Sequence, residues 1–216
     1  MEEVGPPVDG GPATAPPAEA IEGLHVRLEP IAPSHAPGLY ARSHATPEDA
    51  AIWTYMPYGP FADAGEMSRW VTTCVGSSDP LFFAIVERAS GAPVGMASLL
   101  NVDTAMRRLE LGHIWYARDA QRGRANTETA YLLLREAFDV WGYRRAEWKC
   151  DALNARSRAA AERLGFTFEG VFRQHMIVKG RNRDTAWFAM LDGEWPRRRA
   201  AMEDWLEAEP GTPLAR

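Results

Sequence analysis

The 216-residue sequence predicts a mixed α+β domain in which strands and helices alternate along the chain. Residues 24–30 alternate apolar and polar side chains, which is the period of a half-buried strand, and Pro30 ends the run. From Thr127 to Trp141, large apolar residues instead recur at helical spacing, and Gly142 follows as a C-cap. Segments of both kinds continue to either side, so one domain containing a sheet and helices is expected.

The N-terminal part divides into a tail and the start of the domain. Residues 1–20 are rich in Pro, Gly and Ala, so we expect a flexible tail, with a single domain over residues 21–216. Residues 46–64 contain several prolines and aromatic rings, which predicts a loop with an aromatic lining. Helices are expected on either side of this loop, at 36–43 and 65–74.

The rest of the chain completes a set of about seven strands without an internal repeat. Asn154 is expected to cap a helix that ends before Gly165. The last two strands read as an antiparallel hairpin followed by a short C-terminal helix. Strands are expected at 81–88, 93–101, 107–117, 144–151, 166–180 and 183–192.

Composition and charge exclude several classes of protein. Hydrophobic residues make up 46% and charged residues 25%, as in soluble globular proteins, and the net charge of -5 argues against nucleic acid or a membrane as partner. The basic run 197–199 reads as a solvated helix face. Cys74 and Cys150 are widely spaced, so neither a disulfide framework nor a bound metal is expected. The acidic start and the lack of a long apolar window predict a cytoplasmic protein.

The most informative stretch is WYARDAQRGRANTETAYLLL, residues 115–134, where a strand leads through an arginine-rich loop into a helix. Such a junction presents unpaired backbone N–H groups and the positive end of the helix dipole, which together bind phosphate. A diphosphate is the natural ligand. Any strand–loop–helix unit has a polar junction, so this stretch alone is a weak signal.

The second stretch, DALNARSRAAAERLGF, covers residues 151–166. Asn154 and Ser157 lie three residues apart at the helix start, where capping alone would explain them without excluding a ligand contact. Arg156 and Arg158 could meet phosphate, although isolated helix arginines are more often solvated.

The two stretches, in this order and separation, resemble the acetyl-CoA-binding core of the GNAT superfamily. Residues 153–174 with 180–191 resemble its ribosomal-protein N-terminal acetyltransferase (RimJ/RimL-type) branch. The resemblance spans about residues 24–195. It implies a GNAT fold, in which a central, mostly antiparallel twisted sheet is flanked by helices and a splayed parallel strand pair holds the cofactor.

The loop motif departs from the usual superfamily pattern at two positions. Residues 122–127 fit its register, but Ala125 and Thr127 stand where glycines are usual, and a Cβ at a tight turn limits how close a pyrophosphate comes. Both side chains are small and the N–H donors remain, so acetyl-CoA binding is expected to survive. The resemblance implies cofactor contacts from Trp115, Ala117, Arg122, Gly123, Arg124, Ala125, Asn126, Thr127, Asn154, Ser157 and Arg158.

Acyl transfer to an amine requires a base, a polarised carbonyl and a proton for the thiolate. His113 matches a strand position where some relatives carry a base, and its ordinary pKa near 6.5 suits the role, although a hydrogen-bonded core histidine is equally expected. Strand alternation places His113 on one face with Leu109, Leu111 and Trp115, opposite Glu110. Glu110 is the alternative base, unless it pairs with an arginine such as Arg108 or Arg145.

For the acid, many superfamily members carry a tyrosine where this chain has Ala161. The resemblance to the ribosomal-type branch implies that the acid is the serine three residues after the asparagine, which is Ser157 here. That branch also has a glutamate on the following strand, where this sequence has Met176 next to His175. We therefore rank His113 above His175 and Glu110 as the base.

The acceptor site of this fold is built by the loop that holds Trp53, Tyr55, Met56 and Tyr58. These rings could clasp a peptide terminus or a flat ligand, and core packing is the alternative. Two residues of the last hairpin, Asp184 and Trp187, could complete the pocket.

The resemblance implies an N-acetyltransferase that moves an acetyl group from acetyl-CoA to a primary amine through a ternary complex. The amine belongs to a protein or peptide N-terminus or to a small molecule. The altered glycines and the missing tyrosine leave open a non-catalytic acyl-CoA-binding module, and transfer of another acyl group such as succinyl also stays open. A nucleotide-binding regulator lacks support because no GxxxxGK[ST] sequence occurs. A homodimer is left open.

Overall fold

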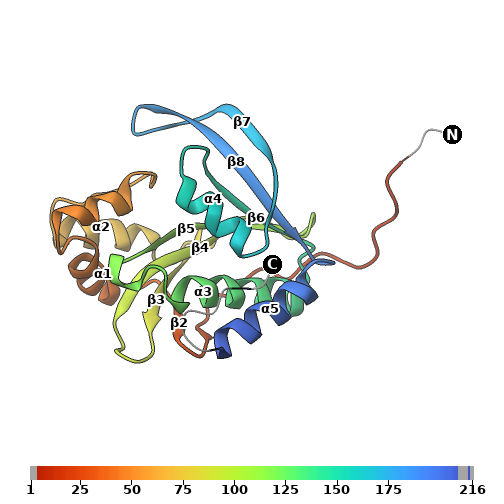
Figure 1. Ribbon diagram of the computed structural model, residues 1–216, viewed down its shortest axis with the longest axis horizontal. Coiled ribbons are helices and arrows are strands. Elements are labelled where there is room, and N and C mark those ends of the chain that lie inside the picture. The colour runs from red at the N-terminus through yellow and green to blue at the C-terminus, as the bar shows by residue number, and fades with distance from the viewer. Residues whose placement is uncertain (1–3, 209–213, 215–216) are drawn as a thin grey trace.

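The computed structural model describes residues 4–208 and Leu214, and it contains one eight-stranded sheet with the strand order β1-β2-β3-β4-β5-β6-β8-β7 (Figure 1). All neighbouring strands are antiparallel except β5 and β6. The expected mixed, mostly antiparallel sheet is confirmed, with a two-residue edge strand added. The strands are β1 Ile21–Glu22, β2 Val26–Pro30, β3 Leu81–Glu87, β4 Pro93–Asp103, β5 Arg108–Tyr116, β6 Arg145–Asp151, β7 Thr167–Val178 and β8 Arg181–Leu191.

The helices lie close to their expected positions. They are α1 Ala36–Ser43, α2 Ala64–Cys74, α3 Arg124–Arg135, α4 Ala155–Arg163 and α5 Trp195–Glu207. α3 starts three residues earlier than expected and passes into a π-helical turn, Glu136–Val140, before Gly142. The expected aromatic loop begins with a 3-10 helix, Pro47–Trp53. No helix in the described ranges is long and apolar enough to cross a membrane.

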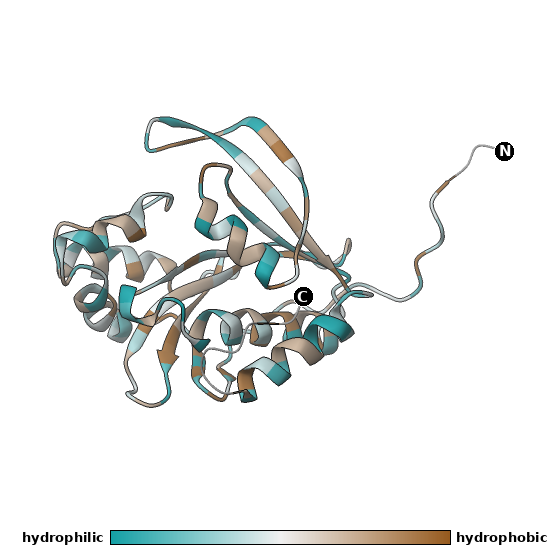
Figure 2. Ribbon diagram, in the orientation of Figure 1, coloured by the Kyte–Doolittle hydropathy of each residue, from teal (hydrophilic) through white to brown (hydrophobic). Residues whose placement is uncertain are grey.

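Two hydrophobic cores lie on opposite faces of the sheet. One contains Leu109, Leu111 and Phe188 and packs against α3, α4 and α5. The other contains Phe82 and Met96 and packs against α1, α2 and the 3-10 helix. Figure 1 shows α1 and α2 apart from α3 and α5, and Figure 2 shows teal and brown alternating along α5, as expected for an amphipathic helix.

β5 and β6 pair for only part of their length. The parallel pairing runs from Arg108 opposite Arg145 to Leu111 opposite Trp148, and in the described part of the chain it ends there. β5 nevertheless continues to Tyr116 and β6 to Asp151, where it still pairs with β8. The two strands therefore separate, which confirms the expected splayed pair.

A β-bulge lies in β5 at the point of separation. β4 pairs Met96 with Trp115 and Ser98 with Gly112, so two residues, His113 and Ile114, oppose one residue of β4. His113 adopts a φ of 51°. The bulge shifts the alternation by one residue, so the expected faces are wrong beyond Gly112. Trp115 packs in the α1–α2 core.

Two sets of long-range hydrogen bonds attach the N-terminal segment to the rest of the fold. Backbone N–H groups of Ala13 and Thr14 donate to the carbonyls of Thr104 and Trp141, at 2.9 and 2.8 Å. The buried carboxylate of Glu128, on α3, accepts the N–H groups of residues 24–26 before β2. The segment before β2 is thereby attached to α3, the helix that follows β5.

Candidate active site

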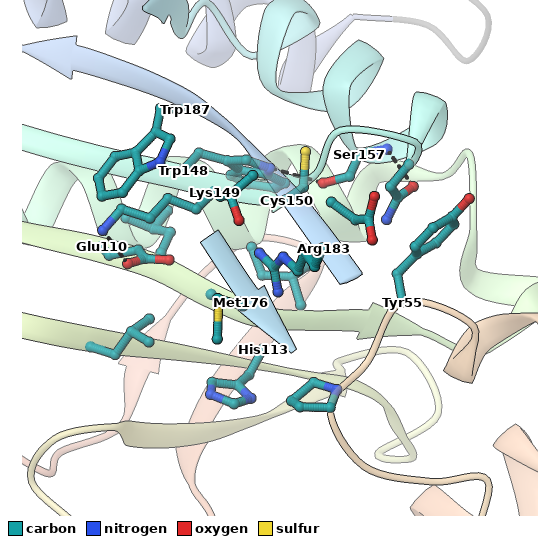
Figure 3. Close-up of a pocket in the computed structure, with 18 of the residues that line it drawn as sticks. Tyr55, Glu110, His113, Trp148, Lys149, Cys150, Ser157, Met176, Arg183 and Trp187 are labelled. Carbon is teal, nitrogen blue, oxygen red and sulfur yellow. Dashed lines mark hydrogen bonds and ion pairs between the residues drawn. The ribbon is translucent and has the colours of Figure 1, made fainter. Parts of the chain in front are cut away.

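A cavity of about 570 Å³ lies where β5 and β6 separate, and Figure 3 shows the side chains that surround it. Side chains of β5, β6 and β8 form its floor, and the loop after the 3-10 helix forms one wall. The lining includes Tyr55, Met56, Pro57, Asn101, Arg108, Glu110, Gly112, His113, Ile114, Trp148, Lys149, Cys150, Asp151, Asn154, Ser157, His175, Met176, Arg183, Thr185 and Trp187.

Glu110 belongs to a buried ionic cluster on the floor of this cavity. Lys149 Nζ lies 2.9 Å from Glu110 Oε2 and 2.9 Å from Glu147 Oε2, and it stacks 3.7 Å from the ring centre of Trp187. Asn101 Nδ2 donates to the same Glu110 oxygen at 2.7 Å. Burial raises the pKa of Glu110, and Lys149 only partly offsets this rise.

The arginines expected as partners of Glu110 bind other carboxylates. Arg108 pairs with Asp103 at 3.3 Å, and Arg145 pairs with Glu147 and Glu169 at 2.8 and 2.6 Å. Burial opposes ionisation of Glu147, but the hydrogen bonds from Arg145 and Lys149 hold its pKa below the ordinary value. The two glutamates that share Lys149 are therefore shifted in opposite directions.

His113 sits at the bulge, against aromatic rings. Its ring stacks on Tyr58, with centroids 5.6 Å apart and planes 11° from parallel, and lies 5.0 Å from the ring of Phe82. Nδ1 is buried and has no hydrogen-bond partner in the described part of the chain. Burial lowers the pKa of His113 to about 4, so the imidazole is neutral at pH 7.

The N-terminus of α4 brings Asn154 and Ser157 to the cavity. Asn154 is the N-cap, as expected, and its Oδ1 accepts the Ser157 N–H at 3.1 Å. Trp148 Nε1 donates to Ser157 Oγ at 3.0 Å. Because an indole N–H can only donate, the hydroxyl hydrogen of Ser157 points to another acceptor, and the Cys150 thiol lies within its reach. Arg158 binds the Ala152 carbonyl at 3.3 Å and does not line the cavity.

The loop residues 122–127 form the N-terminus of α3. The N-cap is Gly123, which provides no side-chain cap, so the first-turn N–H groups have no side-chain partner there. Arg122 is exposed, with a φ of 63°. The Arg124 guanidinium donates to the carbonyls of Leu206 and Ala208 at the end of α5.

Ala125 and Thr127, which stand where glycines are usual in the family, pack against the rest of the protein. Ala125 packs against the α3 core, and Thr127 is fully buried. Arg163, on α4, donates to Thr127 Oγ1 at 2.8 Å and to Asn126 Oδ1 at 2.7 Å. The first turn of α3 is therefore held by α4.

The remaining expected cofactor contacts lie along β5. The Ala117 N–H donates to the Val94 carbonyl at 2.8 Å, within the sheet, and the Trp115 side chain is buried. The carbonyl between them, that of Tyr116, accepts from Gln121 Nε2 at 3.0 Å.

The expected acceptor residues separate into two groups. Tyr55 lines the cavity, and its hydroxyl donates to the Leu153 carbonyl at 3.1 Å. Trp53 is fully buried and does not line the cavity, and Tyr58 lies behind His113. Lys179 Nζ, at the tip of the β7–β8 hairpin, donates to the Trp53 carbonyl at 2.9 Å.

The last hairpin contributes more than the sequence indicated. Trp187 lines the cavity, whereas Asp184 does not and accepts the Gln174 N–H at 2.7 Å. Arg183 also lines it and was missed, as was Lys149. Residues separated by an even number of positions on a strand share a face, so Arg183 could have been inferred from Trp187, four residues later. Among the described residues, no group of three or more His, Cys, Asp or Glu side chains could hold a metal ion.

Residues 25–167 match the family described as an acetyltransferase (GNAT) domain. This chain belongs to the GNAT acetyltransferase family. The family binds an acyl-CoA and an acceptor, and the separated β5–β6 pair with its cavity agrees with that use.

Solved GNAT structures support the same assignment over almost the whole chain. A GCN5-related N-acetyltransferase from Brucella melitensis is 43% identical, with a TM-score of 0.89, covering 94% of this chain and 90% of that one. A GNAT-family protein from Chromobacterium violaceum is 38% identical, with a TM-score of 0.83, covering 91% and 98%.

A named relative supports the expected branch of the family. Bacillus subtilis YdaF, named as a ribosomal N-acetyltransferase, is 32% identical over 105 residues. The match covers 49% of this chain and 57% of YdaF, so it spans little more than half the length of that relative. The resemblance to ribosomal-protein acetyltransferases is thus confirmed at the level of the family.

Proposed function

We propose that this GNAT protein transfers an acetyl group from acetyl-CoA directly to a primary amine in a ternary complex. The observation that carries the proposal is the position of the cavity. It opens where β5 leaves β6, with Ser157 at one side and Glu110 and His113 on the floor. All three side chains line the cavity next to the gap in which a thioester would lie.

The residues around the gap suit acetyl-CoA as the donor substrate. The uncapped first turn of α3 offers backbone N–H groups to the diphosphate, with Arg122 exposed beside it. Asn154 lies at the cavity, where its amide could contact the pantetheine arm. Bound there, the donor supplies an activated acetyl group. The bulge at His113 and Ile114 releases backbone from the regular ladder, and its N–H groups are suited to polarise a carbonyl.

We assign the base role to Glu110 and place His113 second, which reverses the order expected from the sequence. A histidine with a pKa of about 4 is a weak proton acceptor at pH 7, whereas the raised pKa of Glu110 makes it a stronger base than an ordinary carboxylate. Asn101 and Lys149 both bind Oε2, so no donor among the described residues occupies Oε1. The amine proton would reach Oε1 directly or through water.

Ser157 is the proposed acid. Its Oγ accepts from Trp148, which orients the hydroxyl, and its hydrogen can pass to the departing thiolate. The reaction then forms an amide C–N bond, breaks the C–S bond, and moves one proton from the amine to the base and one from the hydroxyl to sulfur. The hydroxyl regains its proton from solvent or from the base.

The proposal is tested by following free thiol release from acetyl-CoA over a panel of amines, with N-terminal peptides, amino acids and simple amines as acceptors. Calorimetry with acetyl-CoA and succinyl-CoA, run in parallel, measures which acyl donor binds. Turnover with at least one amine is expected. Tight binding of acetyl-CoA without thiol release on any amine would establish the alternative, a non-catalytic acyl-CoA-binding module.

The base assignment has its own test. Glu110→Gln should lower kcat by roughly 100-fold or more and leave acetyl-CoA affinity near the wild-type value. Glu169→Gln is the matched control, because Glu169 also pairs with a basic residue, Arg145, but lies outside the cavity. If instead His113→Phe removed turnover and Glu110→Gln did not, the base would be His113.

A further inference from the structure

Arg183 is a cationic side chain that lines the cavity without an anionic partner. It extends from β8 and occupies the middle of the view in Figure 3, between Tyr55 on one side and Glu110 and Lys149 on the other. Its Nε is buried and has no hydrogen-bond partner, and no carboxylate of the described residues lies within 4.0 Å of its guanidinium nitrogens. Asp151, which also lines the cavity, accepts the Leu153 N–H at 2.8 Å instead.

The other positive charges of the cavity are compensated. Lys149 lies between Glu110 and Glu147, and Arg108 pairs with Asp103. A partly buried guanidinium without a counter-charge costs free energy, because it loses hydration and gains no hydrogen bonds in return. Such a group is suited to bind an anion, and its planar fork matches the two oxygens of a carboxylate or a phosphate.

The position of Arg183 on the sheet indicates which substrate would carry that anion. Ala186 and Phe188 of the same strand lie in the core under α3 and α4. Arg183 is an odd number of positions away from both, so its side chain projects from the opposite face of the sheet. The proposed diphosphate site is the N-terminus of α3, on the Phe188 face. Arg183 thus lies on the face that holds Glu110 and His113, where the acceptor would bind.

We propose that Arg183 anchors an anionic group of the acceptor, so that the substrate is an amine that also carries a carboxylate or a phosphate. The inference rests on the proposed transfer to an amine. With the anion held by Arg183, the amine end of the acceptor can point along the cavity floor toward Glu110 and the bulge. The α-amino acids and phosphorylated amines have this chemistry, whereas neutral amides and simple alkylamines lack it.

The test compares acceptors that are matched except for the anion. Because the anion also raises the pKa of the amine, every rate is expressed per concentration of the neutral amine. Kinetics of thiol release are measured for alanine and alaninamide, for phenylalanine and phenylalaninamide, and for phosphoethanolamine and ethanolamine. The wild-type protein should prefer the anionic member of at least one pair by roughly 10-fold or more in kcat/KM, which a charge-assisted hydrogen bond of this kind supplies. Preference in the amino-acid pairs identifies a carboxylate, and preference only for phosphoethanolamine identifies a phosphate.

Variants of Arg183 link the preference to this side chain. Arg183→Gln should raise KM for the anionic acceptor roughly 10- to 100-fold, leave the rate for its neutral partner unchanged, and leave acetyl-CoA affinity by calorimetry unchanged. Arg183→Lys should recover part of the preference, because the charge remains and the fork is lost. Arg181→Gln is the matched control, since Arg181 is exposed on the same strand outside the cavity.

Failure of this inference is distinct from failure of the proposed function. Equal kcat/KM values within every pair, or a preference that persists in Arg183→Gln, would overturn the anion anchor while transfer to an amine stands. If no amine reacts, equilibrium binding of the same pairs to the CoA-loaded protein replaces the rates. Tighter binding of the anionic member, abolished in Arg183→Gln, would support the anchor without the enzyme, and equal or undetectable binding would overturn it.

Discussion

Lys149 pairs with Glu110 at 2.9 Å across the two parallel strands, immediately before those strands separate. The pair lies at the end of the β5–β6 pairing, where Glu110 faces Glu147 in the register. Lys149 therefore compensates two carboxylates that the sheet places side by side next to the cavity.

Replacing Lys149 by methionine should destabilise the protein by roughly 3 kcal/mol, because Glu110 and Glu147 would then face each other without their shared cation. Urea unfolding followed by tryptophan fluorescence measures this loss. The double variant Lys149→Met, Glu110→Gln should regain part of the stability, since one of the two carboxylates is removed. Full additivity of the two single changes would contradict a direct interaction.

Burial of His113 should make stability depend on pH between about 4 and 6.5. The pKa of His113 is lowered to about 4 in the folded state, so the unfolded chain binds more protons in that window. The contribution is fully present above pH 6.5 and is lost as the pH falls toward 4, by roughly 3 kcal/mol at most.

This pH effect is measured by urea unfolding at pH 7 and pH 5. His113→Phe preserves the stacking on Tyr58 and should flatten the difference between the two pH values. His175→Phe is the matched control, because His175 is exposed, and it should behave as the wild type. An unchanged difference in the His113→Phe protein would mean that other groups produce the effect.

Ser157→Ala should lower kcat for thiol release by roughly 10- to 100-fold while α4 stays capped, since Asn154 binds the backbone N–H of residue 157. Loss of the hydroxyl also leaves Trp148 Nε1 without its acceptor, which should cost about 1 kcal/mol in urea unfolding. Ser157→Cys keeps a donor and should recover part of kcat. A fall in stability with unchanged kcat would leave Ser157 a structural role only.

Asn154 is expected to act both as a cap and as a contact of the donor. Asn154→Asp keeps the capping oxygen but loses the amide donor, whereas Asn154→Ala loses both. The Ala variant should therefore lose about 1 kcal/mol of stability and also acetyl-CoA affinity, and the Asp variant should lose affinity only. Wild-type affinity in Asn154→Asp, measured by calorimetry, would restrict Asn154 to capping.

The arrangement of strands and helices was predictable because local sequence signals determine it. Asn154, Gly142 and the alternating runs mark element ends by their own conformational preferences, and the structure places elements close to them. The bulge at His113 was not predictable, since a single extra residue leaves the composition of the strand unchanged. Regular alternation through this segment predicts the wrong faces for His113 and Trp115, because the bulge reverses them.

The sequence indicated several side chains of the cavity but not how they pair. Asn154, Ser157 and the α3 N-terminus follow from sequence spacing. The partner of Glu110 does not, because the choice between Arg108, Arg145 and Lys149 depends on the register of two strands that are far apart in the sequence.

Two hydrogen bonds hold the cavity wall that carries Tyr55. One joins its hydroxyl to Leu153, and the other joins Lys179 to Trp53. Both bonds add to the packing of Trp53, which is buried in the core against α1 and α2. The wall therefore joins three segments that are far apart in the sequence, namely the loop, the turn before α4 and the tip of the β7–β8 hairpin, so a substitution in any one of them would change the surface that the acceptor meets.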